Sequence, residues 1–457
     1  MMEYSRQDIF YIPIEDDYLI YSPLQGVAAL INSEAFNILN TNGLQGGNWG
    51  VNNPLSELCQ IFLIPAQKPP AERSGPFNPE FLGLIPTRGC NMECAYCDFR
   101  PGEGQMMVME TQIAFRALEW IAEKEVEAGR RLLNVHFFGG EPFLPMDLVK
   151  QVVRRARILA EERGLRPRFE ACTNGTFSEQ DALWIADNFD TVILSLDGPA
   201  EIQNQYRPMK GGRKSFPIVH RNARIFGQGT GEFCIRICVH NKNIEGLEET
   251  VQWFLKEYNP SMIAIEPIKI TPDVTAGLKP PNPTEFVRQF AGAAMVMEAH
   301  GVRAVHSMSD TEQVQSSFCP VGKDGFIISP DGRISACYLL ERDWCKKGLD
   351  LNFGDITQEG RVVIRGEDLK RIRKLIVQNK ERCKTCFCKW HCAGGCHVSH
   401  TPPGYSNEYS DLCQQTRAIT VWKLLRGLNL EDRAEEFLKD PVVRGDGINI
   451  YGYTNPT

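Results

Sequence analysis

The sequence predicts an α/β protein whose central part is a parallel β-sheet. Between residues 80 and 305, strand-like apolar runs alternate with amphipathic, helix-like segments. This alternation is typical of βαβ units, in which right-handed crossovers place successive strands in parallel. Functional side chains of such sheets lie at the carboxyl ends of the strands. The six strand-like segments are FLGLIP, LLNVHFF, RFEACT, TVILSL, FCIRICV and MIAIEPI.

Three further regions flank this sheet. Residues 1–75 predict a small α+β unit, with strands in DDYLIYSP and GVAALIN and helices in SEAFNILN and PLSELCQIFLIP, followed by a Pro-rich linker. Residues 306–425 are loop-rich and cysteine-rich and end in the helix-like TRAITVWKLLRGL. Residues 426–457 form a tail without a strong structural signal.

The composition excludes several classes of protein. The chain has 457 residues, of which 42% are apolar and 23% are charged, so it is globular rather than disordered. A net charge of −7 disfavours nucleic-acid binding. No apolar run is long enough to cross a membrane, and the N-terminus does not resemble a signal peptide. We therefore expect a cytoplasmic protein, in which 16 clustered cysteines are more often metal ligands than disulfides.

The first cysteine cluster follows the first strand. Cys90, Cys94 and Cys97 have the spacing C-x3-C-x2-C. Three thiolates on one short loop suit three irons of a [4Fe–4S] cluster and leave the fourth iron open. An open metal position suits catalysis, whereas a structural zinc knuckle, the alternative, needs a fourth protein ligand.

Further motifs follow at the ends of the next three strands. They are Gly139-Gly140-Glu141-Pro142, Thr173-Asn174-Gly175 and Ser195-Leu196-Asp197-Gly198. Together with the cysteine loop and its aromatic residue Tyr96, this order resembles the radical S-adenosylmethionine (SAM) superfamily. The resemblance implies a partial (β/α)6 TIM-like barrel. It also implies that an open iron binds SAM, that SAM cleavage gives a 5′-deoxyadenosyl radical, and that this radical takes a hydrogen atom from the substrate.

The resemblance also implies the residues that bind SAM. The backbone and glutamate of the Gly-Gly-Glu-Pro segment would hold the amino group, Ser195 would contact the carboxylate or ribose, and Arg207 would reach the carboxylate. The full set of expected SAM contacts is Tyr96, Gly139, Gly140, Glu141, Pro142, Thr173, Asn174, Ser195, Asp197 and Arg207.

The second cysteine region has a longer pattern, C…G-x4-C…C-x2-C-x5-C-x3-C…C. It resembles the SPASM domain, which occurs in radical SAM enzymes that modify peptides and proteins and binds two auxiliary [4Fe–4S] clusters. The resemblance implies three [4Fe–4S] clusters in all. The seven matching cysteines are Cys319, Cys337, Cys383, Cys386, Cys392, Cys396 and Cys413.

The resemblance implies that Cys383, Cys386, Cys392 and Cys413 close one auxiliary cluster, and that Cys319, Cys337 and Cys396 hold the other. Two closed clusters need eight ligands. Some relatives have an eighth cysteine where this chain has Gly325. The vacant position is either open, which we favour because an open iron suits a substrate thiolate, or filled by Cys345 or Cys388. A zinc-ribbon-like domain is the alternative, but it leaves three cysteines unexplained.

Three residues are candidates for catalysis: Asp98, Glu266 and Tyr338. Asp98 adjoins a predicted cluster ligand, and Glu266 ends the sixth strand. Anaerobic sulfatase-maturating enzymes, one branch of the resembled family, have an acidic residue directly after the G-x4-C cysteine, where this chain has Tyr338. The difference argues against sulfatase maturation. Tyr338 is either a packed aromatic residue, which we favour, or a group that transfers a proton or electron.

Residues 1–75 resemble the winged-helix-like leader-binding unit of peptide maturases, which adds a leader peptide to a sheet edge as a strand. The alternative is an extension that packs on the barrel. We therefore predict a radical SAM maturase that forms an oxidative thioether or carbon–carbon crosslink in a ribosomally made precursor peptide. Its other partner would be a flavodoxin or ferredoxin type of reductant. The alternatives are a sulfatase-maturating type of oxidase and a non-catalytic zinc-binding module.

Overall fold

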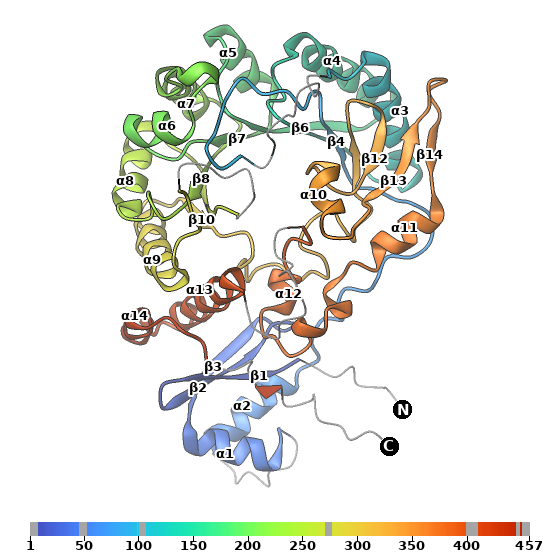
Figure 1. The fold of residues 1–457 in the computed structure, drawn as a ribbon. Coiled ribbons are helices and arrows are strands. Elements are labelled where there is room, and N and C mark those ends of the chain that lie inside the picture. Colours follow the sequence, from blue (N-terminus) through green and yellow to red (C-terminus); the bar gives the residue numbers. More distant parts are fainter. Residues whose placement is uncertain are drawn as a thin grey trace.

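The computed structural model describes residues 8–44, 53–97, 99, 107–269, 277–398, 410–444 and 448–449. Its central feature is a sheet of parallel strands that curves into an open barrel (Figure 1). The six predicted strands are hydrogen-bonded neighbours in sequence order, which confirms the predicted fold class. They are β4 (Leu82–Leu84), β5 (Leu132–Phe137), β6 (Arg166–Thr173), β7 (Thr191–Ser195), β8 (Glu232–Val239) and β9 (Met262–Pro267), and β10 (Arg303–Val305) extends the series.

Helices cover the outer face of the barrel (Figure 1). Their ends carry ordinary capping signals: the Asn282 side chain caps α9, and Gly164 ends α4 in the left-handed conformation. None of the helices described is long and apolar enough to span a membrane. The helices are α3 (Thr111–Glu127), α4 (Met146–Arg163), α5 (Glu179–Asn188), α6 (Ala200–Tyr206), α7 (Phe216–Gln228), α8 (Leu247–Tyr258) and α9 (Pro283–Ala299).

Strand alternation separates the helix-facing side of the barrel from its interior. On β5, Leu133, Val135 and Phe137 are buried in the main core, whereas Asn134 and His136 between them are only half-buried. Because successive strand residues point to opposite faces, Asn134 and His136 face the barrel interior. Polar residues at alternate positions of β5, β6 and β8 therefore line the inside of the barrel.

The cysteine-rich region has more regular structure than the sequence predicted. β11 (Phe326–Ile328) pairs in parallel with β4, and three antiparallel strands continue the same sheet. The sequence pattern missed these strands because most of them have only three residues. The added elements are β12 (Arg333–Ser335), β13 (Asn352–Ile356), β14 (Val362–Ile364), α10 (Glu341–Cys345), α11 (Gly366–Arg373) and α12 (Lys389–Cys392). The predicted helix in TRAITVWKLLRGL is present as α13 (Asp411–Gly427), and α14 (Glu431–Lys439) lies in the tail.

The N-terminal unit is an antiparallel sheet with two helices, α1 (Ser33–Asn42) and α2 (Pro54–Leu63). Its order is β15 (Ile448–Asn449), β1 (Phe10–Ile14), β2 (Asp17–Ser22), β3 (Val27–Asn32). The predicted β2, β3, α1 and α2 are present, whereas β1, β15 and α14 were missed. One face of the sheet packs with α1 and α2, and the other face joins the main core. The unit lies next to α12 (Figure 1).

Candidate functional site

The first three cysteines lie on the loop that leaves the carboxyl end of β4. Cys94 is buried, and Cys90 and Cys97 are half-buried. Burial raises the pKa of Cys94 to about 12; the Arg207 guanidinium opposes this shift, and the neighbouring thiols of Cys97 and Cys90 add to it. The structure therefore brings the three predicted ligands together, and their role as ligands stays a prediction.

The two glycines after β5 let that strand end press against the cysteine loop. A Cβ on Gly140 would lie 2.2 Å from the Gly89 carbonyl oxygen, and one on Gly139 would lie 2.5 Å from that of Thr87. In the space this leaves, the Glu141 N–H donates to the Gly89 carbonyl at 2.8 Å. The Gly-Gly sequence is thus required by close approach of two backbones.

The Glu141 carboxylate accepts hydrogen bonds from donors of the protein itself. Its carboxylate accepts hydrogen bonds from the Thr173 hydroxyl at 2.7 Å, the Asn174 N–H at 2.7 Å and the Phe143 N–H at 3.2 Å. Burial raises the pKa of Glu141 to about 7, although these donors oppose the shift. The Asn174 amide in turn donates to Cys90 Sγ at 3.5 Å. Glu141 therefore holds the end of β6 against the cysteine loop, a role that sequence reasoning did not assign to it.

A second buried network joins the cysteine loop to β7 and β8. The Tyr96 hydroxyl donates to the Asp197 carboxylate, and Arg207 Nη1 donates to the Tyr96 oxygen at 2.8 Å. Asp197 also accepts from the Cys238 N–H at 3.1 Å. Arg207 Nε is buried and has no hydrogen-bond partner among the described residues. An unused guanidinium N–H beside the cysteine loop suits an anionic group such as the SAM carboxylate. Ser195 ends β7 near this network and is half-buried.

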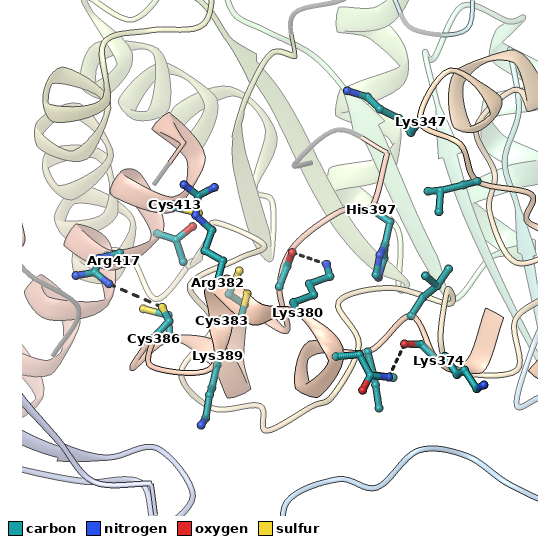
Figure 2. Close-up of a pocket in the computed structure, with 18 residues that line it drawn as sticks. Lys347, Lys374, Lys380, Arg382, Cys383, Cys386, Lys389, His397, Cys413 and Arg417 are labelled. Atoms are coloured by element: carbon teal, nitrogen blue, oxygen red, sulfur yellow. Dashed lines mark hydrogen bonds between the residues drawn. The ribbon is translucent and has the colours of Figure 1, made fainter. Parts of the chain in front are cut away.

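Four of the predicted auxiliary ligands line one cavity of about 340 Å³ (Figure 2). They are Cys383, Cys386, Cys392 and Cys413. Burial raises the pKa of Cys392, and the thiols of Cys413, Cys386 and Cys383 add to the shift. Residues from two segments about 20 positions apart thus meet around one cavity, in the grouping that the family resemblance implies.

The other three predicted auxiliary ligands form a separate group. Burial raises the pKa of Cys337, and the neighbouring Cys319 and Cys396 thiols raise it further. A Cβ on Gly325 would lie 2.5 Å from Pro320 Cβ, so the position has no room for a cysteine side chain without rearrangement. Cys319 and Cys396 are thus close enough to Cys337 to affect its pKa.

The two contenders for the vacant ligand lie elsewhere. Cys388 is beside Cys386, and its Sγ lies 3.4 Å from the Thr420 hydroxyl, so it belongs with the first auxiliary group. Cys345 is exposed at the end of α10. In the described part of the chain, no three Cys, His, Asp or Glu side chains are close enough to hold a single metal ion.

The three catalytic candidates have different surroundings. Asp98 lies outside the described residues. Glu266 accepts a hydrogen bond from the Ser307 N–H at 2.8 Å. The Tyr338 ring packs 4.8 Å from the Phe138 ring, and its buried hydroxyl has no hydrogen-bond partner among the described residues. A Cβ on Gly83 of β4 would lie 2.5 Å from this hydroxyl, so the glycine makes room for the tyrosine.

Sequence reasoning missed the polar lining of the barrel beside Tyr338. His136 Nε2 on β5 and Arg236 Nε on β8 are buried without a hydrogen-bond partner among the described residues. Glu170 and Cys172 lie on β6, one of the two strands between them. Their alternation with buried apolar neighbours, visible in LLNVHF and EFCIRICV, was the available signal. The inner face of the barrel is thus polar beside Tyr338.

Comparisons with known proteins agree with this geometry. Residues 84–254 match the Radical SAM superfamily, and residues 319–388 match an iron–sulfur cluster-binding domain, SPASM. The cysteine-type anaerobic sulfatase-maturating enzyme of Clostridium perfringens strain ATCC 13124 is 26% identical over 328 residues, which cover 67% of this chain and 86% of that protein. The radical SAM cyclopropyl synthase TigE of Paramaledivibacter caminithermalis is 21% identical over 196 residues, 40% of each chain.

Two solved structures share the fold. The C. perfringens sulfatase-maturating enzyme with bound SAM superposes with a TM-score of 0.60 and 20% identity, covering 78% of this chain and 100% of that chain. SuiB of Streptococcus suis, solved with its precursor peptide SuiA, superposes with a TM-score of 0.52 and 13% identity and covers 89% of this chain and 98% of that chain.

Proposed function

Because the chain belongs to the radical SAM enzymes that carry a SPASM domain, and so uses SAM and iron–sulfur clusters, we propose that it matures a ribosomally made peptide. The proposed product is a peptide with an oxidative thioether or carbon–carbon crosslink between side chains. We further propose three [4Fe–4S] clusters, one at Cys90, Cys94 and Cys97 and two in the SPASM domain.

The N-terminal sheet is the observation that carries the peptide assignment. β15 pairs with one edge of the sheet, at β1, while β3 forms the other edge and pairs only with β2 among the described strands. An edge strand presents unpaired N–H and C=O groups to an added strand. β3 is also apolar, and its Leu30 is half-buried. A leader peptide would add to the β3 edge.

The extent of the structural matches supports the same assignment. The sulfatase-maturating structure is matched over its whole length but covers only 78% of this chain, whereas SuiB covers 89%. SuiB was solved with its precursor peptide, which favours a peptide substrate for this chain.

The residues of the chain would orient the reactants. When bound, the cluster and SAM would supply a 5′-deoxyadenosyl radical that takes a hydrogen atom from the substrate. Gly139 and Gly140 would give SAM backbone access, and Arg207 would bind its carboxylate. His136, Arg236 and Tyr338, on the inner side of the barrel, would contact the reacting side chains. As the new bond forms, the substrate loses a further proton and electron, and the electron would leave through the auxiliary clusters.

Iron content and SAM cleavage test this proposal. Anaerobic reconstitution should give about twelve irons per chain, because we propose three four-iron clusters. Cys94→Ala should lose about four irons and all 5′-deoxyadenosine formation. Cys345→Ala, at an exposed position, is the matched control and should retain both. Only four irons in the unaltered protein would contradict the auxiliary clusters, and 5′-deoxyadenosine from Cys94→Ala would contradict the SAM site.

The peptide assignment is tested with precursor peptides encoded beside the gene. Turnover should give a product lighter by two hydrogen atoms for each crosslink. Leu30→Lys on β3 should weaken leader binding at least about tenfold, a loss of about 1.4 kcal/mol, because it places a charge on the docking edge. Lys68→Leu, in the linker, is the control. Unchanged affinity in Leu30→Lys would contradict leader binding at β3.

A second candidate is oxidation of a protein cysteine or serine, as the names of the sulfatase-maturating relatives indicate. Their sequence similarity favours it. This chain has Tyr338 at the position where those enzymes have an acidic residue, and this difference disfavours oxidation of a cysteine or serine. Formation of an aldehyde in a sulfatase-derived peptide, without need for a leader, would select this candidate.

The proposal implies a reducing compartment and a one-electron partner. All sixteen cysteines are free, and ten of them are proposed cluster ligands. Free thiols of this kind suit the reducing cytoplasm. A flavodoxin or ferredoxin type of protein would exchange electrons with the clusters.

A further inference from the structure

We propose that a small pocket beside the first cysteine loop binds a carboxylate of the substrate peptide through the Arg88 guanidinium. The inference rests on the proposed function, since it takes a peptide to be the substrate, and it adds that this peptide carries a carboxylate close to the residue that is modified. The observations behind it are the place of the pocket, the unused donors that line it and the ion pairs that occupy its other charges.

The pocket lies between the cysteine loop and the C-terminal region. It has a volume of about 230 Å³ and is lined by Arg88 of the cysteine loop and by residues of β12 and α10. Figure 1 shows α10 beside β12 and β13. A Cβ on Gly140 would lie 2.5 Å from the Arg88 carbonyl oxygen, so the pocket adjoins the segment that we propose for SAM. Met107 also lines the pocket and is 55% exposed, so the pocket reaches the protein surface.

Tyr338 lies between this pocket and the inner side of the barrel. Its carbonyl oxygen accepts a hydrogen bond from Arg88 Nη1 at 3.3 Å. Its hydroxyl lies at β4, where a Cβ on Gly83 would be 2.5 Å from it. A peptide whose reacting residue contacts the inner side of the barrel can therefore place a nearby group in the pocket.

Several donors that line the pocket are not used by the protein itself. Arg88 is half-buried, and among the described residues it donates only to Tyr338 and forms no ion pair. The side chain of Asn352 makes no hydrogen bond in the described part of the chain. Trp344 is 2% exposed, and its indole Nε1 is buried without a partner among the described residues. Unused donors of this kind favour a ligand that accepts hydrogen bonds.

The other charges that line the pocket are already paired. Both acidic residues, Asp331 and Glu341, pair with Arg333, and the Asp331 pair is 3.2 Å long. A third arginine of the lining, Arg342, pairs with its neighbour Asp343 at 3.8 Å. The guanidinium of the cysteine loop is therefore the cation that lacks a counter-ion among the described residues of the lining.

A carboxylate fits this pocket better than other anions do. A planar guanidinium donates two parallel N–H bonds to a carboxylate. The two acidic side chains of the lining repel a doubly charged phosphate more strongly than a singly charged carboxylate. Pro330, Leu340 and the Trp344 ring provide apolar walls, which suit the carbon atoms next to the carboxylate. In a peptide, an Asp or Glu side chain and the C-terminus both present this group.

The test uses the reconstituted full-length enzyme and the precursor peptide encoded beside its gene. Three kinds of altered peptide are compared with the unaltered one: core Asp residues changed singly to Asn, core Glu residues changed singly to Gln, and the C-terminus converted to an amide. Each change replaces a carboxylate with a neutral group of nearly the same size. The Kd of each peptide is measured by calorimetry without reductant, so the result does not depend on turnover.

One of these changes should raise the Kd for the unaltered enzyme at least about tenfold, because a charge-assisted hydrogen bond is lost. Arg88→Gln should raise the Kd of the unaltered peptide by a similar factor. It should raise the Kd of the altered peptide less than about twofold further, since both changes remove the same interaction. Asn352→Ala should raise the Kd about threefold. Arg154→Gln, which removes a charge at an exposed position of α4, is the control and should change the Kd less than about twofold.

The peptide that loses affinity identifies the source of the carboxylate, either an acidic side chain of the core or the C-terminus. Equal affinity of all the peptides would overturn the proposal, as would an Arg88→Gln variant that binds peptides with and without the carboxylate equally less well. Iron content is recorded for every variant, and if Arg88→Gln loses iron, Asn352→Ala is judged by the same comparison. If the unaltered enzyme binds none of the peptides, the proposed function itself fails, and the pocket proposal with it.

Discussion

At the cysteine loop, the backbone packing depends both on the missing side chains of glycines and on the hydrogen bonds of neighbouring side chains. Gly139 and Gly140 allow two backbone segments to come into contact. The Glu141 carboxylate accepts hydrogen bonds from the end of β6. Tyr96, Asp197 and Arg207 then connect the loop to β7 and β8. The loop is therefore placed by two independent buried networks, which preorganises the thiols before any group binds.

Gly140→Ala should remove SAM-dependent chemistry while leaving the auxiliary clusters intact. The added Cβ would meet backbone oxygens of Gly89 and Arg88 at 2.2 Å and 2.5 Å, and neither can move without shifting the cysteine loop. A displacement of this size costs at least about a hundredfold in rate. The measurement is 5′-deoxyadenosine formation alongside iron content. Gly366→Ala, where nothing lies within 4 Å of the new Cβ, is the control. Near-normal turnover in Gly140→Ala would show that the loop tolerates the shift.

Among the elements, β10 and α9 enclose a histidine that the proposed chemistry does not use. His306 follows β10, is fully buried, and lies 5.6 Å from the Phe286 ring and 6.0 Å from the Phe290 ring. Its Nδ1 lies 3.1 Å from the Ser309 hydroxyl, and its Nε2 has no partner among the described residues. Burial lowers the pKa of His306 to about 4, because the charged form is desolvated among these rings.

This histidine makes stability depend on pH. The unfolded side chain, with a pKa of about 6.5, takes up a proton before the folded one does. Its contribution is fully present above pH 6.5 and is lost as the pH falls, by about 1.4 kcal/mol per unit down to about pH 4. Urea unfolding at a series of pH values should show a shallower acid slope in His306→Gln. His300→Gln, at the exposed end of α9, should keep the slope. Identical slopes in both variants would contradict a neutral buried His306.

At the scale of the whole molecule, the three regions of the sequence share one core. The main core contains side chains from the N-terminal sheet, the barrel and α13. β11 joins the barrel sheet beside β4. A buried ion pair between Arg373 and Asp324, with nitrogen and oxygen 2.6 Å apart, connects α11 to the segment before β11. Arg373 also donates to the Gly75 and Pro76 carbonyls of the linker.

Arg373→Leu should lower the free energy of unfolding by about 3–5 kcal/mol, because it leaves the Asp324 carboxylate buried without its partner. Asp324→Asn/Arg373→Leu should be less destabilised than Arg373→Leu, since the unpaired charge is removed as well. Arg371→Leu, whose ion pairs are exposed, is the control and should change stability by less than about 1 kcal/mol. Chemical denaturation measures all three. Additive effects in the double variant would show that the ion pair contributes nothing.

The sequence by itself determined the elements with strong periodicity and the residues with a fixed spacing. The alternation of strands and helices gave β4 to β9, and the cysteine spacing gave ten candidate ligands. The division of these ten thiols into three groups is what the family resemblance implies. Both are local properties of the sequence, because periodicity and spacing can be recognised without knowing which residues are in contact. The roles of those thiols stay predictions.

Only the tertiary structure decided what depends on distant contacts. The short strands β11 to β14 form because they can pair with β4 and one another, and β15 because it can pair with β1. The Glu141 carboxylate binds the end of β6, and the donors there lie about thirty residues away in the sequence. Cys413 meets Cys383, Cys386 and Cys392 around one cavity because the chain returns to the same place after about twenty residues. Non-local pairing of this kind leaves no periodic signal in the residues that make it.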